Sequence, residues 1–310
     1  MQKRPVIIDC DPGTDDIAAL LLARNMECFD VRAVTPVAGN TELEFTLRNT
    51  LQLLSFMDWK LPVGKGADAP LFRPLETAEY IHGKGGMMGL KLPDATMNPS
   101  EKPAWDLIYE IAVECGGTLE IVAVGPLTNI AIALMKHPDL SGLIKKIVIM
   151  GGAFLAGNTT PAAEFNIYVD PEAAKRVFES GIPFYLCPLD VTHEGYLTAG
   201  EFEEIAAFGS KEAKFFAEVA GGRIEKGLIY TKGCGAALHD PLALLFAEND
   251  EYFEYEECFI GVETEGTVTR GRTVTDCYSD KQLFKNGYLV KSVDRARFVE
   301  RIKQLMRQYT

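Results

Sequence analysis

The chain has 310 residues, 47% of them hydrophobic and 24% charged, which is ordinary for a globular protein with a substantial core. Its formal net charge of −13 argues against nucleic acid, an anionic membrane surface and a heavily phosphorylated substrate, since all three are bound through basic patches. The seven cysteines form no CxxC pair, no apolar run approaches the length of a membrane span, and the first predicted strand begins at Val6. We therefore expect a cytoplasmic protein with reduced thiols and no signal peptide.

The stretch from residue 6 to residue 16 joins a strand to a helix. Val6 to Ile8 have the apolar run of a short buried strand, Pro12 and Gly13 are typical of a turn, and residues 17–24 have the pattern of an apolar helix. Ligands of open α/β sheets bind at the carboxyl ends of the strands, which is where this junction would lie. The junction carries four carboxylates: Asp9, Asp11, Asp15 and Asp16.

This acidic junction favours a bound cation. A pair of Asp residues at a helix start is commonly structural, as an N-cap or first-turn residue. However, the helix dipole stabilises a carboxylate by only about 0.3–1 kcal/mol, which is too little to hold several of them together. A cation would offset their repulsion, and a set of oxygen ligands favours Ca²⁺ or Mg²⁺ over zinc.

Strands and helices alternate along most of the chain, and the alternation of polar and apolar residues at 255–293 predicts antiparallel strands. Further strands are predicted at 31–37, 119–124, 146–150 and 182–187, and helices at 41–57, 104–115, from 128 onward, 171–180, across 198–227, after Asp240 and at 295–309. We expect a single α/β domain over residues 1–310. Its core would be an open, mostly parallel, Rossmann-like sheet with helices on both faces and a few extra antiparallel strands.

Two segments stand out from this alternation. Residues 64–103 are rich in Gly, Pro and Met, and a loop of this length is usually functional or a lid. The sequence leaves open whether the loop at 66–103 closes over a ligand. Further along, Asp240 precedes Pro241 and an apolar run, so we expect Asp240 to cap the next helix with Pro at the first helical position.

Several motifs occur in a fixed order along the chain. They are Asp-Cys-Asp-Pro-Gly-Thr-Asp-Asp from Asp9, Val-Gly-Pro-Leu-Thr-Asn from Val124, Met-Gly-Gly from Met150 followed by Gly-Asn and Ala-Glu-Phe-Asn, and His-Asp-Pro from His239. Through these motifs the chain resembles the inosine-uridine preferring nucleoside hydrolases over residues 5 to about 246. The resemblance implies Ca²⁺-dependent hydrolysis of the N-glycosidic bond of ribonucleosides to ribose and free base. It also implies a homo-oligomer, either a tetramer or a dimer.

The resemblance assigns the metal site and the base. Asp11, Asp16 and Asp240 would be the side-chain ligands of Ca²⁺, joined by the main-chain carbonyl of Val124. Asp11 would also be the base that activates a metal-bound water. Asp9 would contact the ligands but would not bind the metal itself. The assigned chemistry is physically consistent, because carboxylates stabilise the positive charge of a ribosyl oxocarbenium ion.

The resemblance also assigns contacts to the substrate. Asp15 would bind the ribose 2′-hydroxyl, Asn40 would lie beside the water, and the remaining contacts would come from the middle of the chain. There, Glu164 and Asn166 would bind ribose hydroxyls, and Asn158 and the Met150 backbone would lie near the 5′ end. Phe165 and Tyr230 could supply apolar surface to the base, Tyr230 being equally compatible with a proton relay or a packed helix aromatic.

The departing base leaves poorly as an anion, so it needs a proton or a hydrogen bond. Two histidines stand at positions of the family that would serve this role. His239 adjoins the proposed ligand Asp240, and His82 lies in a loop whose residues 84–88 depart from the family's acidic pattern. We expect His239 to assist the leaving group, and the role of His82 stays open. His137 and His193 are expected to be structural.

The positions of the two tryptophans in the sequence indicate which base the protein would prefer. One branch of the family grips purines between tryptophans, but here Trp59 and Trp105 both lie away from the motifs. The pair of His82 and His239 resembles instead the branch that is pyrimidine-preferring or nonspecific. We expect uridine and cytidine as substrates first and inosine next, and the sequence does not decide whether 2′-deoxyribose is accepted.

Two other functions compete with this one. The spacing of Asp9, Asp11 and Thr14 resembles the nucleophile loop of haloacid-dehalogenase-type phosphatases, although the Thr is one position off and the later lysine and Gly-Asp motif of that class are not evident. A non-catalytic nucleoside-binding protein is the other alternative. It is disfavoured because the acids, the candidate base and the candidate proton donor are all present.

Overall fold

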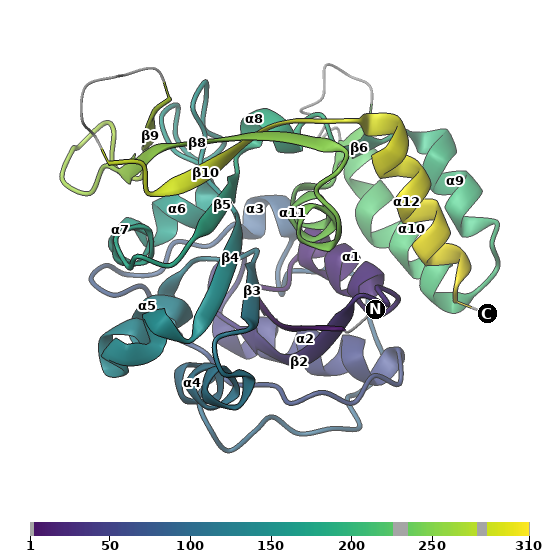
Figure 1. Ribbon diagram of the computed structural model, residues 1–310. Helices are drawn as coiled ribbons and strands as arrows, with labels where there is room; N and C mark the ends of the chain where they lie inside the picture. Colours follow the sequence, from purple (N-terminus) through teal and green to yellow (C-terminus); the bar gives the residue numbers. More distant parts are fainter. Residues whose placement is uncertain (1–2, 226–234, 278–283, 310) are drawn as a thin grey trace.

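The computed structural model describes residues 3–225, 235–277 and 284–309. In these residues, an eight-stranded sheet crosses the molecule, in the strand order β2-β1-β3-β4-β5-β10-β8-β9 (Figure 1). Neighbours from β2 to β10 are parallel, whereas β8 pairs antiparallel with both β10 and β9. The strands are β1 (Arg4–Cys10), β2 (Phe29–Pro36), β3 (Leu119–Ala123), β4 (Ile144–Met150), β5 (Phe184–Cys187), β8 (Phe253–Val262), β9 (Thr273–Asp276) and β10 (Gly287–Val293).

Helices cover both faces of this sheet. One face packs against α4, α5 and α7, and the other against α1, α2 and α11, with α10 and α12 packed on the outer side of α1 (Figure 1). The helices are α1 (Thr14–Ala23), α2 (Leu43–Phe56), α3 (Glu79–His82), α4 (Ala104–Cys115), α5 (Thr128–Lys136), a 3₁₀ turn (Pro138–Gly142), α6 (Phe165–Val169), α7 (Pro171–Phe178), α8 (Leu189–Thr192), α9 (Ala199–Ala206), α10 (Lys211–Glu225), α11 (His239–Glu248) and α12 (Arg295–Arg307).

The sequence of β1 shows why the sheet is covered on both sides. Successive side chains of a strand point to opposite faces, and here Val6 and Ile8 join one hydrophobic cluster while Ile7 joins the other. All three are at most 1% exposed. A strand buried on both faces is largely apolar, which is typical of parallel sheets, and the predicted fold class is therefore confirmed.

Two helices begin earlier than the sequence predicted. Helix α1 starts at Thr14 and not at residue 17, so Asp15 and Asp16 lie in its first turn, where the helix dipole favours negative charge. Helix α11 starts at His239, with Leu238 at the N-cap position. The expected N-cap role of Asp240 is therefore wrong, since Asp240 lies within the first turn.

Several short helices and strands were not predicted from the sequence. The segment 64–103 contains only the single turn of α3, as expected of a loop, but the polar loop after β4 includes α6. Helix α8 and a small antiparallel sheet of β6 (Tyr196–Leu197) with β7 (Ala236–Ala237) were not predicted either. Elements of two to five residues carry too few positions for a periodic pattern to show. Among the described residues, no helix is long and apolar enough to cross a membrane.

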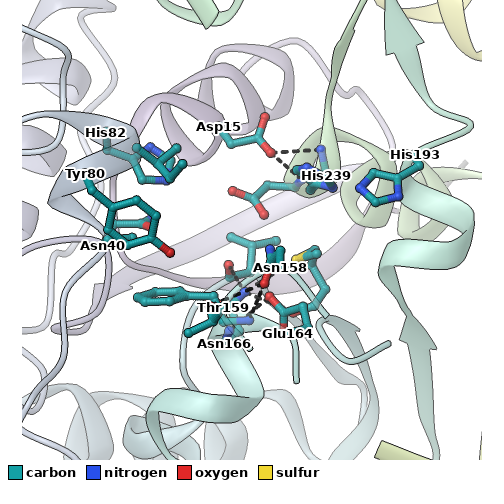
Figure 2. A pocket seen from close by; sticks show the side chains of 16 residues that line it. Asp15, Asn40, Tyr80, His82, Asn158, Thr159, Glu164, Asn166, His193 and His239 are labelled. Carbon is teal, nitrogen blue, oxygen red and sulfur yellow. Dashed lines mark hydrogen bonds between the residues drawn. The ribbon is translucent and has the colours of Figure 1, made fainter. Parts of the chain in front are cut away.

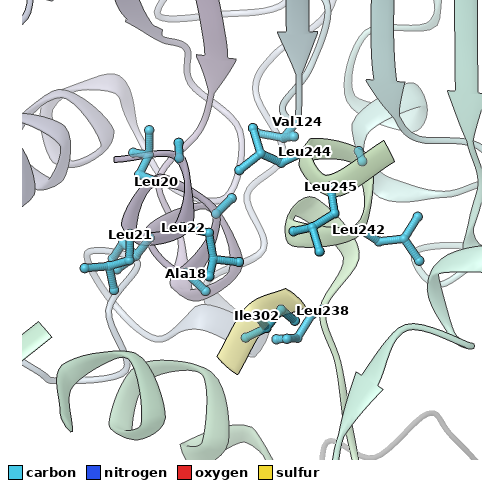
Figure 3. Packing of buried hydrophobic residues seen from close by; sticks show 14 of the residues in the cluster. Ala18, Leu20, Leu21, Leu22, Val124, Leu238, Leu242, Leu244, Leu245 and Ile302 are labelled. Atoms are coloured by element: carbon cyan, nitrogen blue, oxygen red, sulfur yellow. The ribbon is translucent and has the colours of Figure 1, made fainter. Parts of the chain in front are cut away.

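Helices α1 and α11 pack against each other through a leucine-rich core. Side chains of both helices fill the space between them, and Ile302 of α12 closes that space from one side (Figure 3). Leu22 of α1 and Leu245 of α11 are both 0% exposed. This packing fixes the N-terminus of α1 relative to that of α11.

A truncation in this core tests its contribution. We predict that Leu22→Ala lowers the free energy of unfolding by about 2–5 kcal/mol, because it removes buried methyl groups and leaves a cavity. Urea unfolding followed by circular dichroism measures the change. The control is Leu155→Ala, at a side chain that is 89% exposed, and a similar loss in both variants would contradict the prediction.

Candidate active site

A pocket of about 690 Å³, its open mouth included, lies at the carboxyl ends of the parallel strands (Figure 2). Residues expected to bind substrate or metal form most of its wall: Asp15, Asn40, His82, Val124, Met150, Asn158, Glu164, Phe165, Asn166, His239 and Asp240. They come from segments that are far apart in the sequence but follow β1, β2, β3 and β4 or begin α11. The parallel sheet brings these segments together at one edge, as expected for an open α/β fold.

Asp11 and Asp16 lie beneath this wall and are at most 1% exposed. The carboxylate of Asp16 accepts hydrogen bonds from the main-chain N–H of Asp11 at 2.9 Å and of Gly13 at 3.0 Å. Asn40 joins the two acids, because its N–H donates to Asp11 Oδ2 at 2.7 Å and its Nδ2 donates to Asp16 Oδ2 at 3.1 Å. A Cβ atom at Gly125 would lie 2.8 Å from Asp11 Oδ1, so only glycine leaves room there for the carboxylate.

Asp15 connects α1 to α11. Its Oδ2 accepts hydrogen bonds from the main-chain N–H of His239 at 2.8 Å and of Asp240 at 3.3 Å (Figure 2). These N–H groups belong to the first turn of α11, where a helix has no partner of its own for them. Asp15 therefore satisfies main-chain donors of another helix, which replaces the cap that we expected from Asp240.

On the opposite wall, Glu164 is the N-cap of α6. Its carboxylate accepts from the N–H groups of Asn166 at 2.9 Å, Ile167 at 3.2 Å and Gly152 at 2.9 Å. Asn166 in turn donates its Nδ2 to the carbonyl oxygens of Val124 at 2.9 Å and Met150 at 3.2 Å. The ends of β3 and β4 are thereby tied to the loop that carries Glu164.

Asn158 lies in the same loop, and its Oδ1 accepts from the N–H of Phe165 at 3.0 Å. Phe165 is only 8% exposed but contributes to the pocket wall. Tyr230 lies outside the described residues.

Two pocket histidines are each held at Nδ1 by a threonine. His82 Nδ1 lies 3.0 Å from Thr14 Oγ1, and His239 Nδ1 lies 2.7 Å from Thr192 Oγ1. His193 lies beside His239, with ring centroids 5.5 Å apart (Figure 2).

Five residues of the pocket wall were not expected from the sequence: Ala78, Tyr80, Ile81, Thr159 and His193. His193, which we expected to be structural, lines the pocket next to His239. A signal for it existed, since His193 closely follows the carboxyl end of β5, the edge where ligands bind. His137 does have a structural setting, stacked 3.9 Å from the ring of Tyr109 and 3.2 Å from Asp106.

The sequence profile described as inosine-uridine preferring nucleoside hydrolase matches residues 6–300. The chain belongs to this family of nucleoside hydrolases. It is 42% identical over 307 residues to the pyrimidine-specific ribonucleoside hydrolase RihA of Salmonella typhimurium, and this similarity covers 98% of the chain and 99% of the relative. The protein is therefore an enzyme that hydrolyses the N-glycosidic bond of ribonucleosides, and the expected family and activity are confirmed.

Solved structures of nucleoside hydrolases share the fold. A purine-preferring ribonucleoside hydrolase from Gardnerella vaginalis superposes with a TM-score of 0.91 at 31% identity, covering 98% of this chain and 100% of the other. A plant nucleoside hydrolase superposes with a TM-score of 0.90 at 30% identity, covering 98% of each chain. The architecture is thus shared with a relative that is named for a purine preference.

The acids of this nucleoside hydrolase are electrostatically unfavourable by themselves. Burial, reinforced by the charge of Asp16, raises the pKa of Asp11 well above its usual value. Burial also raises the pKa of Asp16 to about 6 and that of Glu164 to about 7. In both cases main-chain N–H donors oppose the rise. The site therefore favours a positive charge close to the carboxylates, whether a cation or a cationic transition state.

The donor set fits calcium by its chemistry. The three carboxylates and the carbonyl of Val124 are hard oxygen donors, and Asp11 Oδ1 is buried without a hydrogen-bond partner among the described residues. Within the described parts of the chain, no three His, Cys, Asp or Glu side chains converge closely enough to hold a metal ion. The carboxylate of Asp16 is directed at the main-chain N–H groups of Asp11 and Gly13.

The contribution of the Asn40 side-chain amide to stability can be measured without substrate. We predict that Asn40→Asp lowers the free energy of unfolding by about 1–3 kcal/mol in the presence of a chelator, since a donor to Asp16 becomes a third buried acid beside Asp11 and Asp16. The measurement is urea unfolding at neutral pH. Asn98→Asp, at an exposed asparagine, is the matched control, and equal stability of the two variants would refute the bridging role of Asn40.

Proposed function

We propose that this nucleoside hydrolase prefers pyrimidine ribonucleosides and works with a bound Ca²⁺. The observation that carries the proposal is a pocket with buried carboxylates at its floor and imidazoles in its walls. In such a pocket a ribose would lie on the acids and a base would lie between the histidines.

The pyrimidine preference has two supports. A relative that is 42% identical over almost the whole chain is named a pyrimidine-specific ribonucleoside hydrolase. In addition, neither Trp59 nor Trp105 is part of the described pocket wall, which instead includes His82 and His239. Phe165 would offer its ring to the base as apolar surface.

Ribose recognition would come from acceptors and donors on both walls. Asp15 would accept from the 2′-hydroxyl with the carboxylate oxygen that does not cap α11, and Glu164 and Asn166 would bind further hydroxyls. Asn158 and the main chain of Met150 would lie towards the 5′ end. A neutral ribonucleoside needs no basic side chain in such a site, which agrees with the net charge of −13.

The acids would drive the bond cleavage. Asp11 would accept the proton of the attacking water, and Asn40 would orient that water from its place beside Asp11 and Asp16. The surrounding carboxylates would stabilise the oxocarbenium ion as positive charge develops on the ribose. Asp11, Asp16, Asp240 and the Val124 carbonyl would hold the calcium ion, which supplies a flexible oxygen coordination shell and lowers the pKa of water.

Departure of the base would depend on His239. The hydroxyl of Thr192 at Nδ1 holds the ring, and a hydroxyl can either donate or accept, so it is compatible with both the neutral and the charged imidazole. His239 can therefore hold a proton and deliver it to the leaving base. Neither a phosphatase nor a non-catalytic binding protein is favoured by a contact in this pocket.

The six cysteines of the described chain are all free thiols, which supports a cytoplasmic protein. A homotetramer or a homodimer is proposed from the family resemblance, and light scattering at micromolar concentration distinguishes them.

The proposed activity predicts a specific substrate pattern. Reducing sugar is expected from uridine and cytidine first, and from inosine more slowly, with thymidine testing the need for a 2′-hydroxyl. Activity should vanish from chelator-stripped enzyme and return with Ca²⁺, and Asp11→Asn should lower kcat by about 10²–10⁴. A faster reaction with inosine would refute the base preference, and full activity after stripping would refute the calcium.

The leaving-group role of His239 predicts a substrate-dependent loss. We expect His239→Ala to lower kcat for uridine by about 10²–10⁴ but to spare p-nitrophenyl riboside largely, because p-nitrophenolate departs without a proton. His137→Ala, at the histidine stacked on Tyr109, is the control and should leave both rates unchanged. An equal loss with both substrates would show that His239 acts in another way.

A further inference from the structure

The side chain of His82 meets the beginning of α1. Thr14 is the first residue of that helix, and its main-chain N–H donates to His82 Nδ1 at 3.2 Å. The hydroxyl of Thr14 lies 3.0 Å from the same nitrogen. The first N–H groups of a helix lack partners within the helix, so His82 caps α1 from a different part of the chain.

The contact with the main-chain N–H indicates where the proton of the ring lies. A main-chain N–H can only donate, so His82 Nδ1 must be an acceptor without a hydrogen of its own. The neutral imidazole then carries its proton on Nε2. Nδ1 then has no hydrogen to give, so the Thr14 hydroxyl at 3.0 Å would share the single lone pair of Nδ1 as a second donor. His82 is thus a neutral ring with its donor at Nε2, on the far side from α1.

The surroundings leave little freedom for another arrangement. Thr14 is 0% exposed and His82 is 9% exposed, so water does not compete for these bonds. A Cβ atom at Gly13 would lie 2.7 Å from His82 Nδ1, so the glycine permits the close approach of the ring. His82 also lines the pocket that contains His239.

We propose that Thr14 is a positioning residue that fixes His82 in the Nε2–H tautomer, so that His82 donates a hydrogen bond to a carbonyl oxygen of the departing pyrimidine. This inference rests on the proposed function for its kinetic consequence, but the tautomer itself does not depend on activity. It gives the two histidines different tasks: His82 donates a hydrogen bond and keeps its proton, whereas His239 delivers one.

The tautomer is tested by ¹⁵N NMR of histidine-labelled enzyme, with His82 assigned by its absence from His82→Gln. We expect the wild type to show a hydrogen on Nε2 and an accepting Nδ1. Thr14→Val, which removes the hydroxyl, should shift the Nδ1 resonance, and Thr14→Ser should preserve it. A hydrogen on Nδ1 in the wild type, or identical Nδ1 shifts in wild type and Thr14→Val, would overturn the proposal.

The kinetic arm uses the same variants. Loss of one hydrogen bond to His82 should lower kcat for uridine about three- to tenfold in Thr14→Val with little change in KM, and Thr14→Ser should retain most of the wild-type rate. In a His82→Gln background, Thr14→Val should cause no further loss. A loss as large in that background would show that Thr14 does not act through His82. If the wild type hydrolyses no ribonucleoside, the proposed function fails, while the NMR result still decides the tautomer.

Discussion

The main-chain N–H groups at helix starts are the constraint on which this site depends. Three helices begin at the pocket, and each would bury unpaired donors there without a side chain that accepts from its first N–H groups. His82 receives the first N–H of α1, Asp15 receives those of α11, and Glu164 receives those of α6. The polar side chains that would contact the substrate therefore also fix the positions of these helix ends.

A second constraint is the crowding of buried acids. Burial raises the pKa of Asp11, Asp16 and Glu164, so the folded protein by itself opposes their full ionisation. The fold tolerates them because main-chain and amide donors surround the carboxylates, and because the leucines between α1 and α11 stabilise the framework. A pocket of this kind gains most from ligands that bring positive charge, which is the demand of an oxocarbenium ion.

The sequence predicted the fold class and most of the pocket wall, because each strand ends in a motif and parallel strands bring their carboxyl ends to one edge. Contacts across elements could not be predicted. The cap on α11 is an example, since Asp240 has the local pattern of an N-cap but the actual acceptor is Asp15, distant in the chain. His193 was not expected in the pocket wall because a lone histidine in a loop has no periodic pattern, and its position after β5 indicates the ligand-binding edge only once the order of the strands is known.

Tyr80 is an exposed residue of the pocket wall. Its side chain is 67% exposed, and it lies at the mouth on the single turn of α3, whereas Asp15 and Glu164 anchor helices that the core relies on. Substitutions at the mouth should therefore destabilise the fold less than substitutions at the floor. Sequence changes among related enzymes are thus expected at positions such as Tyr80 before they reach the acids at the floor.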